Sequence, residues 1–125
     1  MTENQIATAI LDQAFKIHRE LGPGLLESVY ERCLQYELTQ AGYFAETQVA
    51  TPMVYKEIRF DAGFRVDLLV NKKVIVEVKA IEILAPVHFA QTLTYLKMSN
   101  LKLGLLINFN VRLLKEGIHR IVNNL

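Results

Sequence analysis

The residues of this chain that could do chemistry lie in two nearly apolar segments, residues 64–70 and 74–80. The first contains Asp67, and the second contains Glu77 and Lys79, which share one strand face because they are two residues apart. Apolar runs of this length predict strands covered on both faces of a sheet. Charges rarely lie buried there unless they are paired or bind a metal ion. This pattern predicts metal-dependent phosphodiester chemistry.

The turn between the two segments decides how the acids are placed. Three polar residues, Asn-Lys-Lys, separate the segments. If Val70 pairs with Val74 across a three-residue loop, Asp67 lies opposite Glu77, with Cβ atoms about 4.5–5.5 Å apart. Two carboxylates at that distance can share one divalent cation. A two-residue turn would instead place the two acids on opposite faces of the sheet.

The composition excludes several classes of protein. The 125 residues are 51% hydrophobic, which predicts one domain over residues 1–125 with a substantial core. A net charge of +1 gives no general attraction to nucleic acid, so any basic surface must be local. With a single cysteine, no signal-peptide pattern and no apolar run near the ~20 residues of a membrane span, we expect a cytoplasmic protein. The histidines lack metal-ligand spacing, so zinc is not expected.

Periodicity and turn residues predict the elements that position the charges. Helices are expected over residues 6–21, about 25–41 and 86–99, and strands over 49–60 (one strand or a bent pair), 64–70, 74–80, 103–108 and about 117–122. Thr2 or Asn4 is expected to cap the first helix, Pro52 to lie at an edge or bulge, and Pro86 to open the third helix.

The predicted order is α-α-β-β-β-α-β-β. The helix after the Glu77 strand joins it to the strand over residues 103–108. A link of that length most often makes a right-handed parallel crossover. The sheet is therefore expected to be mixed, with an antiparallel start, a parallel continuation and helices on both faces.

Two of the predicted helices carry further polar side chains. If Gly24 caps the second helix, Glu27 is its third residue, where a carboxylate favours the helix dipole. Alternatively, Glu27 and Tyr30 point at the metal site as an extra acid and a positioning hydroxyl.

The third helix offers a similar choice. Gln91 and Tyr95 lie on one face of it, with His88 one turn earlier. They form either a half-exposed polar stripe or a contact to a phosphate or base beside the metal.

Taken together, these motifs resemble the GxxExxY proteins, a family of small bacterial and archaeal proteins in the PD-(D/E)XK nuclease superfamily. The residues that carry the resemblance are Gly24, Glu27, Tyr30, Asp67, Glu77-Val78-Lys79, Gln91 and Tyr95. The likeness covers nearly the whole chain, and the Gln-x-x-x-Tyr helix is similar to that of RecB-like nucleases. Val66 stands where the superfamily has a nominal proline before the first acid.

The resemblance implies an α/β, restriction-endonuclease-like fold with three α/β/α layers around a central mixed sheet. It also implies hydrolysis of phosphodiester bonds with Mg²⁺ or Mn²⁺. Asp67 and Glu77 would be the metal ligands, with the Val78 carbonyl as a third. Lys79 would orient or help deprotonate the attacking water and stabilise the phosphate. Glu27 matches the superfamily's helix-borne acid.

The same resemblance makes the third helix the element that positions substrate. Gln91 and Tyr95 match its substrate-positioning residues, and we expect His88 and Tyr30 to contribute beside them.

Three hypotheses follow from the sequence. The first is a metal-dependent nuclease acting on DNA in preference to RNA. The second is a non-catalytic nucleic-acid-binding or assembly module that keeps the nuclease fold. The third is an α/β domain whose buried charges form a structural network. Because specific protein–DNA interfaces bury about 1,000–2,500 Å² of protein surface, a homodimer or a protein partner would supply what one small domain lacks.

Overall fold

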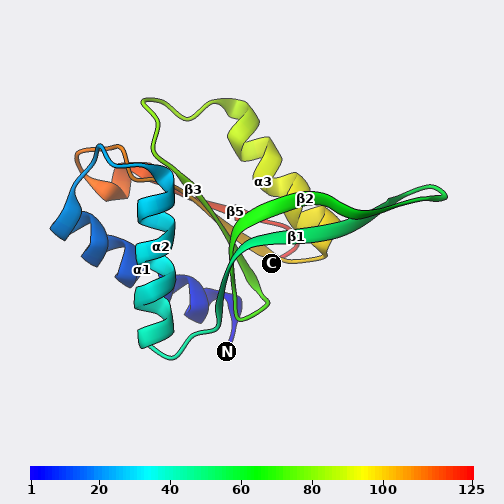
Figure 1. The fold of residues 1–125 in the computed structure, drawn as a ribbon, viewed down its shortest axis with the longest axis horizontal. Coiled ribbons are helices and arrows are strands. Elements are labelled where there is room, and N and C mark those ends of the chain that lie inside the picture. Colours follow the sequence, from blue (N-terminus) through cyan, green and yellow to red (C-terminus); the bar gives the residue numbers. More distant parts are fainter.

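The computed structural model describes residues 1–125 as three α-helices, five strands and one short 3-10 helix (Figure 1). The elements are α1 Glu3–Leu21, α2 Glu27–Gln40, β1 Ala45–Tyr55, β2 Ile58–Val70, β3 Val74–Lys79, α3 Pro86–Ser99, β4 Leu103–Asn108, η1 Leu114–Gly117 and β5 Ile118–Val122. The predicted order is confirmed, with η1 added. The bounds of the first two strands were wrong: β1 begins at Ala45 and ends at Tyr55, and the strand of Asp67 begins at Ile58, because Tyr55 pairs with Ile58 across a tight turn.

The five strands form one mixed sheet in the order β1-β2-β3-β4-β5. Only β3 and β4 are parallel, and α3 connects them, as the crossover prediction required. The helices α1 and α2 lie on one face of the sheet, and α3 lies on the other (Figure 1). The α/β fold with three layers is therefore confirmed.

The core has two parts, one on each face of the sheet. The larger part lies under α1 and α2 and buries Val74, Val76 and Val78 of β3. The smaller part lies under α3 and contains Ile75 and Leu96. Alternate residues of β3 thus enter different cores, which explains its nearly continuous apolar run.

The approach of α3 to the sheet depends on a glycine. A Cβ atom added at Gly104 of β4 would lie 3.0 Å from the Cγ2 atom of Thr92 on α3. Thr92 is fully buried at this contact. The missing side chain therefore lets α3 pack tightly against β4, and this packing fixes the residues on neighbouring turns of α3.

Helix α1 begins where the sequence predicts. Thr2 is its N-cap, and the side chains of Thr2 and Gln5 bond reciprocally to each other's backbone N–H groups. Helix α2 begins later than predicted. Its N-cap is Leu26 rather than Gly24, so Glu27 is the first helical residue.

Tyr30 does not point toward the predicted metal site, which corrects its expected position. Its side chain is fully buried, and its ring stacks on Phe109 with 4.5 Å between ring centroids. The hydroxyl donates to the Gly22 carbonyl at 2.6 Å and accepts from the Leu25 N–H at 3.1 Å. Tyr30 therefore ties the loop between α1 and α2 to the core.

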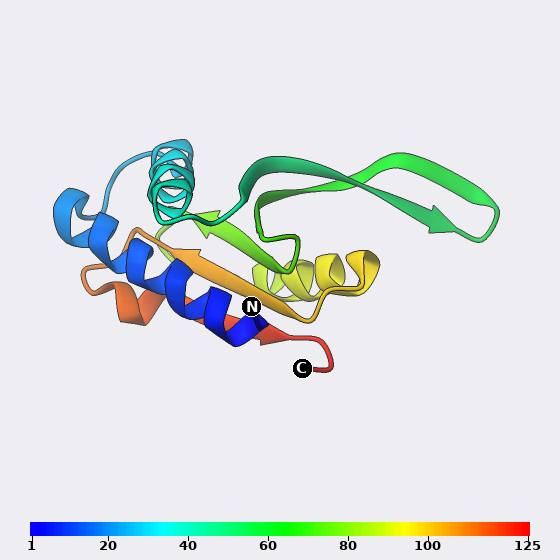
Figure 2. The same ribbon diagram turned by 90° about the horizontal axis from the view of Figure 1, so that it is seen from below.

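The hairpin of β1 and β2 reaches well beyond the rest of the sheet, which both views show (Figures 1 and 2). Its register shifts between Thr51 and Met53, so Pro52 lies at a bulge as expected. None of the helices has the length and apolar character needed to cross a membrane.

Replacing Tyr30 with phenylalanine tests its anchoring role. We expect Tyr30→Phe to lower the free energy of unfolding by about 1–2 kcal/mol, because two backbone groups of the loop between α1 and α2 lose their partner. Chemical denaturation measures the change. Tyr36→Phe is the matched control, since Tyr36 is an exposed tyrosine of the same helix, and it should change little. Equal effects of the two substitutions would contradict the role.

Candidate active site at the fork of two strands

The two predicted acids lie where β2 and β3 separate. Val70 pairs with Val74, which confirms the three-residue turn. Pairing continues to Leu68 and Val76 and ends there, one step before Asp67 and Glu77 would face each other. The acids therefore occupy the first unpaired position of the antiparallel ladder, which we call the fork.

The acids at the fork bond to each other's strands. The backbone N–H of Asp67 donates to Oε2 of Glu77 at 2.9 Å. In return, the backbone N–H of Val78 donates to Oδ2 of Asp67 at 2.8 Å. Each carboxylate thus accepts from a backbone group of the opposite strand. These two bonds bring the carboxylates together even though the strands no longer pair.

Strand β1 is distorted at the same level. The pairs flanking the position, Thr47 with Leu68 and Val49 with Val66, are regular, but Gln48 opposite Asp67 is unpaired. Gln48 has a φ of +50°, a left-handed conformation that is rare for a residue within a strand. Such strain persists only where the surroundings enforce it, and it is concentrated at functional sites.

The Gln48 side chain links two acids. Its Nε2 donates to Oε1 of Glu31 at 2.6 Å and to Oδ1 of Asp67 at 3.3 Å. Because Glu31 belongs to α2, this amide connects the helical layer with the strand. The side chain of Asp67 is therefore fixed from two sides, by Val78 of β3 and by Gln48 of β1.

The alternation of faces along β2 also breaks at the fork. Leu68 and Val70 pack into the core under α1 and α2. Val66 should share their face, but it packs into the core under α3. The strand therefore twists strongly at Asp67. This twist explains why residues of both α2 and α3 lie near the same acids.

The backbone that follows the fork is held at every step. The Lys79 carbonyl accepts from the Phe109 N–H at 2.8 Å, and the Ala80 N–H donates to Oε2 of Glu27 at 3.1 Å. The side-chain amide of Asn108 then pairs with both backbone groups of Ile81, at 2.9 and 3.1 Å. The end of β3 is thereby fixed in place. Glu27 reaches this end from α2 rather than capping its own helix.

The cluster carries an excess of negative charge. Glu77 is only 4% exposed, and its burial, followed by the charge of Asp67, raises its pKa to about 8. Burial likewise raises the pKa of Asp67 and of Glu31, and the charge of Glu27 adds to both effects. Lys79 acts in the opposite direction on Asp67 and Glu77.

No ion pair neutralises these acids. The two salt bridges of the protein join Lys16 to Glu37 and Lys72 to Glu46, away from the fork. Lys79 lies within electrostatic range of Asp67 and Glu77 but forms no salt bridge with either. The site can therefore accept an additional cation.

Helix α3 brings Tyr95 close to the acids. Its ring stacks on Phe64 of β2 with 4.5 Å between ring centroids. Burial, and then the charges of Glu77 and Asp67, raise the pKa of Tyr95. Gln91 is half-buried one turn earlier on the same helix. Tyr95 therefore lies beside the fork, and Gln91 lies one turn earlier on the same helix.

His88 forms a hydrogen bond at the start of α3. Its Nδ1 accepts from the Ala85 N–H at 2.9 Å, which closes the first turn of α3. His88 therefore also stabilises the start of α3, and its position beside the substrate stays a prediction. Pro86 precedes it as the first residue of α3, as expected.

The donor set at the fork suits a hard divalent cation. No group of three or more His, Cys, Asp and Glu side chains is arranged to hold a metal ion by itself. Mg²⁺ does not require such a cage, because it keeps several waters and binds through one or two carboxylates. The adjacent carboxylates of Asp67 and Glu77, with their raised pKa values and no ion-pair partner, meet this requirement.

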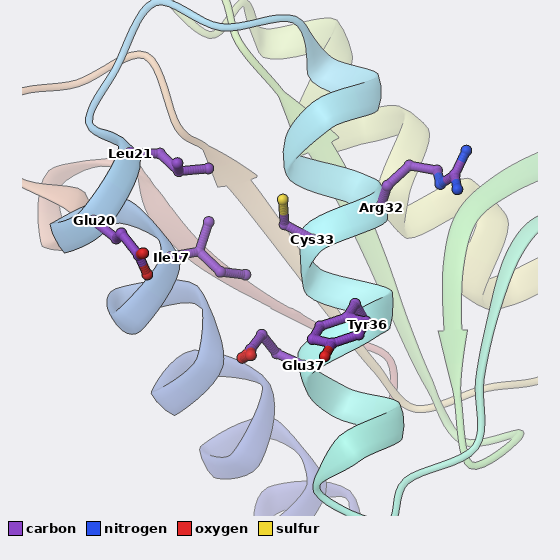
Figure 3. A pocket seen from close by; sticks show the side chains of 7 residues that line it. All are labelled: Ile17, Glu20, Leu21, Arg32, Cys33, Tyr36 and Glu37. Carbon is purple, nitrogen blue, oxygen red and sulfur yellow. The ribbon is translucent and has the colours of Figure 1, made fainter.

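A hollow between α1 and α2 is separate from the fork (Figure 3). Its volume is about 340 Å³, and it is lined by Ile17, Glu20, Leu21, Arg32, Cys33, Tyr36 and Glu37. None of these residues belongs to the acid cluster. The hollow is therefore not the predicted site.

Sequence reasoning missed Glu31 and Gln48. Glu31 could have been found, because it follows Glu27 by four residues and two acids at that spacing repel each other on a helix face. Gln48 gives no such signal. Its importance depends on the backbone distortion and on the register of β1, which only the structure supplies.

Comparison with known proteins agrees with this geometry. A family model described as the PD-(D/E)XK nuclease superfamily matches residues 4–121. No curated protein and no solved structure matches the chain. The match covers every helix and strand except the ends of α1 and β5.

The raised pKa of Glu77 predicts a pH dependence of stability. The folded protein binds more protons than the unfolded chain between pH 4.5, the ordinary pKa of Glu77, and about pH 8, its folded value. Stability without metal should therefore fall as pH rises through this range. Glu77→Gln, which keeps an acceptor for the Asp67 N–H, should flatten this fall and exceed the parent in Tm at alkaline pH.

Thermal denaturation at a series of pH values measures both proteins. Glu116→Gln is the control, because Glu116 is an exposed acid outside the cluster. It should reproduce the parent's curve. A Glu77→Gln protein with the parent's full pH dependence would show that Glu77 titrates normally.

Proposed function

Because this chain belongs to the PD-(D/E)XK nuclease superfamily, we propose that it is a metal-dependent nuclease that hydrolyses phosphodiester bonds in nucleic acid, with DNA as a substrate in preference to RNA. The supporting observation is the pair of carboxylates of Asp67 and Glu77 at the fork, with Lys79 two residues further along β3. Within the superfamily, the Gly24, Glu27 and Tyr30 spacing supports membership of the GxxExxY group.

We place Mg²⁺ or Mn²⁺ between Asp67 and Glu77, with the Val78 carbonyl as a third protein ligand. Oxygen donors suit both ions, and the cation would offset the burial and the neighbouring negative charges that raise the pKa values of the two acids. When bound, such an ion supplies a Lewis acid for the phosphoryl oxygens and a nucleophilic water.

Lys79 acts beside this pair. It is half-buried at the end of β3, and its backbone is fixed by the bond from Phe109. Its ammonium group, which has no salt-bridge partner, orients the attacking water, favours the ionisation of this water through its positive charge, and stabilises the negative charge that develops on the phosphate. Glu27 supports this arrangement by accepting a hydrogen bond from the Ala80 N–H. Glu27 and Glu31 bring the number of acids in the cluster to four.

Helix α3 positions the substrate in this proposal. The Gln91 amide and the Tyr95 hydroxyl donate hydrogen bonds to a phosphate or to a base edge. The raised pKa of Tyr95 keeps its hydroxyl protonated, so it remains a donor. The stacking of Tyr95 on Phe64 fixes the ring for this role.

One observation favours a second candidate, a non-catalytic nucleic-acid-binding or assembly module. The carboxylates of Asp67, Glu77 and Glu27 each accept a backbone N–H, a structural use that needs no metal. Metal binding and turnover distinguish the two candidates.

Cleavage of a set of labelled nucleic acids tests the proposed reaction. The set contains single-stranded, duplex, flap and junction DNA and RNA, incubated with Mg²⁺ or Mn²⁺. We expect the parent to cleave at least one DNA, and Asp67→Asn, Glu77→Gln and Lys79→Met each to reduce the rate by at least about 100-fold, because each removes a ligand or a charge from the reacting centre.

Two controls keep this result interpretable. Lys97→Met removes an exposed lysine of α3 and is the control for Lys79→Met. Glu116→Gln removes an exposed acid and is the control for the substitutions of Asp67 and Glu77. Both controls should leave the rate unchanged. Tight binding without cleavage under either metal would favour the non-catalytic module. Cleavage that survives in Glu77→Gln would contradict the proposed site.

Metal binding predicts a separate change in stability. Mg²⁺ or Mn²⁺ should raise the Tm of the parent, since a ligand that binds only the folded state stabilises it. The same addition should have no effect on the Asp67→Asn and Glu77→Gln double variant. If neither ion changes the Tm of the parent protein, the result would instead support the hypothesis of a structural network of charges.

A further inference from the structure

The outer part of the β1–β2 hairpin, residues 51–64, projects from the body of the molecule, and we call it the arm (Figures 1 and 2). All residues from Val54 to Gly63 are exposed. A two-stranded hairpin is at best marginally stable in water unless something packs on its apolar face. The arm therefore needs an explanation for how its outer part stays folded.

One face of the arm is apolar along its whole length. Directly paired residues share a face of an antiparallel ribbon. The pairs on this face are Thr51 with Phe64, Met53 with Phe60, and Tyr55 with Ile58. The opposite face instead carries pairs such as Val54 with Arg59.

This apolar face continues the core under α3. Val49 and Val66 pair with each other and both pack at that core, and Phe64 stacks on Tyr95. Further out, Met53 is half-buried against Gly63, but Tyr55, Ile58 and Phe60 continue the stripe and are 57%, 54% and 42% exposed. Monomeric proteins rarely expose extended contiguous apolar patches, which usually mark interaction sites.

The open edge of the arm is unsuited to strand addition. Strand β1 is the edge of the sheet, but Pro52 lacks an N–H and the register shift at Thr51 and Met53 bends the ribbon. Both features block the edge-to-edge pairing of another strand. The partner must therefore pack on the apolar face rather than extend the sheet.

The charges of the arm favour a second copy of this chain as the partner. Lys56 and Arg59 are balanced by Glu57 and Asp61, so the arm has no net charge. A polyanion gains little from such a surface. In a two-fold symmetric dimer, by contrast, one patch faces itself, and positive groups of one copy can meet negative groups of the other.

We propose that this protein forms a two-fold homodimer in which the apolar faces of the two arms pack on each other. The arm projects beyond the helices of its own chain (Figure 2), so a second copy can approach it. The proposal stands whether or not the fork is a nuclease site. If it is, the dimer carries two such sites in one particle.

Neighbouring residues of the arm provide a matched test. Tyr55 and Val54 are equally exposed, at 57% and 58%, but lie on opposite faces of the arm. Sedimentation velocity over a concentration series should show a dimer for the parent. Tyr55→Gln and Ile58→Gln should each raise its Kd at least tenfold, because they remove apolar area from the interface, whereas Val54→Gln should leave the Kd unchanged.

Three results would overturn the proposal. The parent could remain monomeric at every concentration, or Val54→Gln could weaken the dimer as much as Tyr55→Gln does. A monomeric parent whose binding to single-stranded DNA is weakened by Tyr55→Gln alone would assign the stripe to nucleic acid instead. Circular dichroism of each variant verifies that the fold is retained.

Discussion

The exchange of hydrogen bonds between Asp67 and the strand of Glu77 governs the rest of the site. At the fork, β2 and β3 stop pairing, and the two carboxylates accept hydrogen bonds from the backbone N–H groups of Asp67 and Val78. The strands can then diverge without leaving these donors unsatisfied. The same bonds hold the two carboxyl groups close together in a buried place, where burial, followed by the charge of Asp67, raises the pKa of Glu77 to about 8. The hydrogen bonds that let the strands diverge therefore also create a negatively charged site that a cation would stabilise.

The surrounding elements are arranged around this opening. The twist of β2 at Asp67 sends Val66 to the core under α3 and Leu68 to the core under α1 and α2. As a result, Glu31 of α2 and Tyr95 of α3 both interact electrostatically with the same acids. The outward continuation of the twisted hairpin forms the arm. One local distortion therefore places residues of both helical layers beside the same acids.

The sequence was sufficient where local patterns decide the structure. The polar triplet before Val74 predicted a turn with two possible registers, of which the three-residue loop that brings Asp67 near Glu77 is the one observed, and the apolar run of β3 predicted a strand covered on both faces. It was insufficient where a side chain had a choice between several hydrogen-bond partners. The hydroxyl of Tyr30 bonds to a loop, and the ring of His88 to its own helix start, because partners nearby satisfy them first. The left-handed Gln48 has no sequence signature.

The most direct test of the central claim is to locate the metal itself. A crystal grown with Mn²⁺ would reveal the ion by its anomalous scattering. The account predicts one strong peak between the carboxylates of Asp67 and Glu77, and no such peak in crystals of the Glu77→Gln protein. An empty fork in the parent crystal, or a peak bound only by other residues, would contradict the assignment of this site.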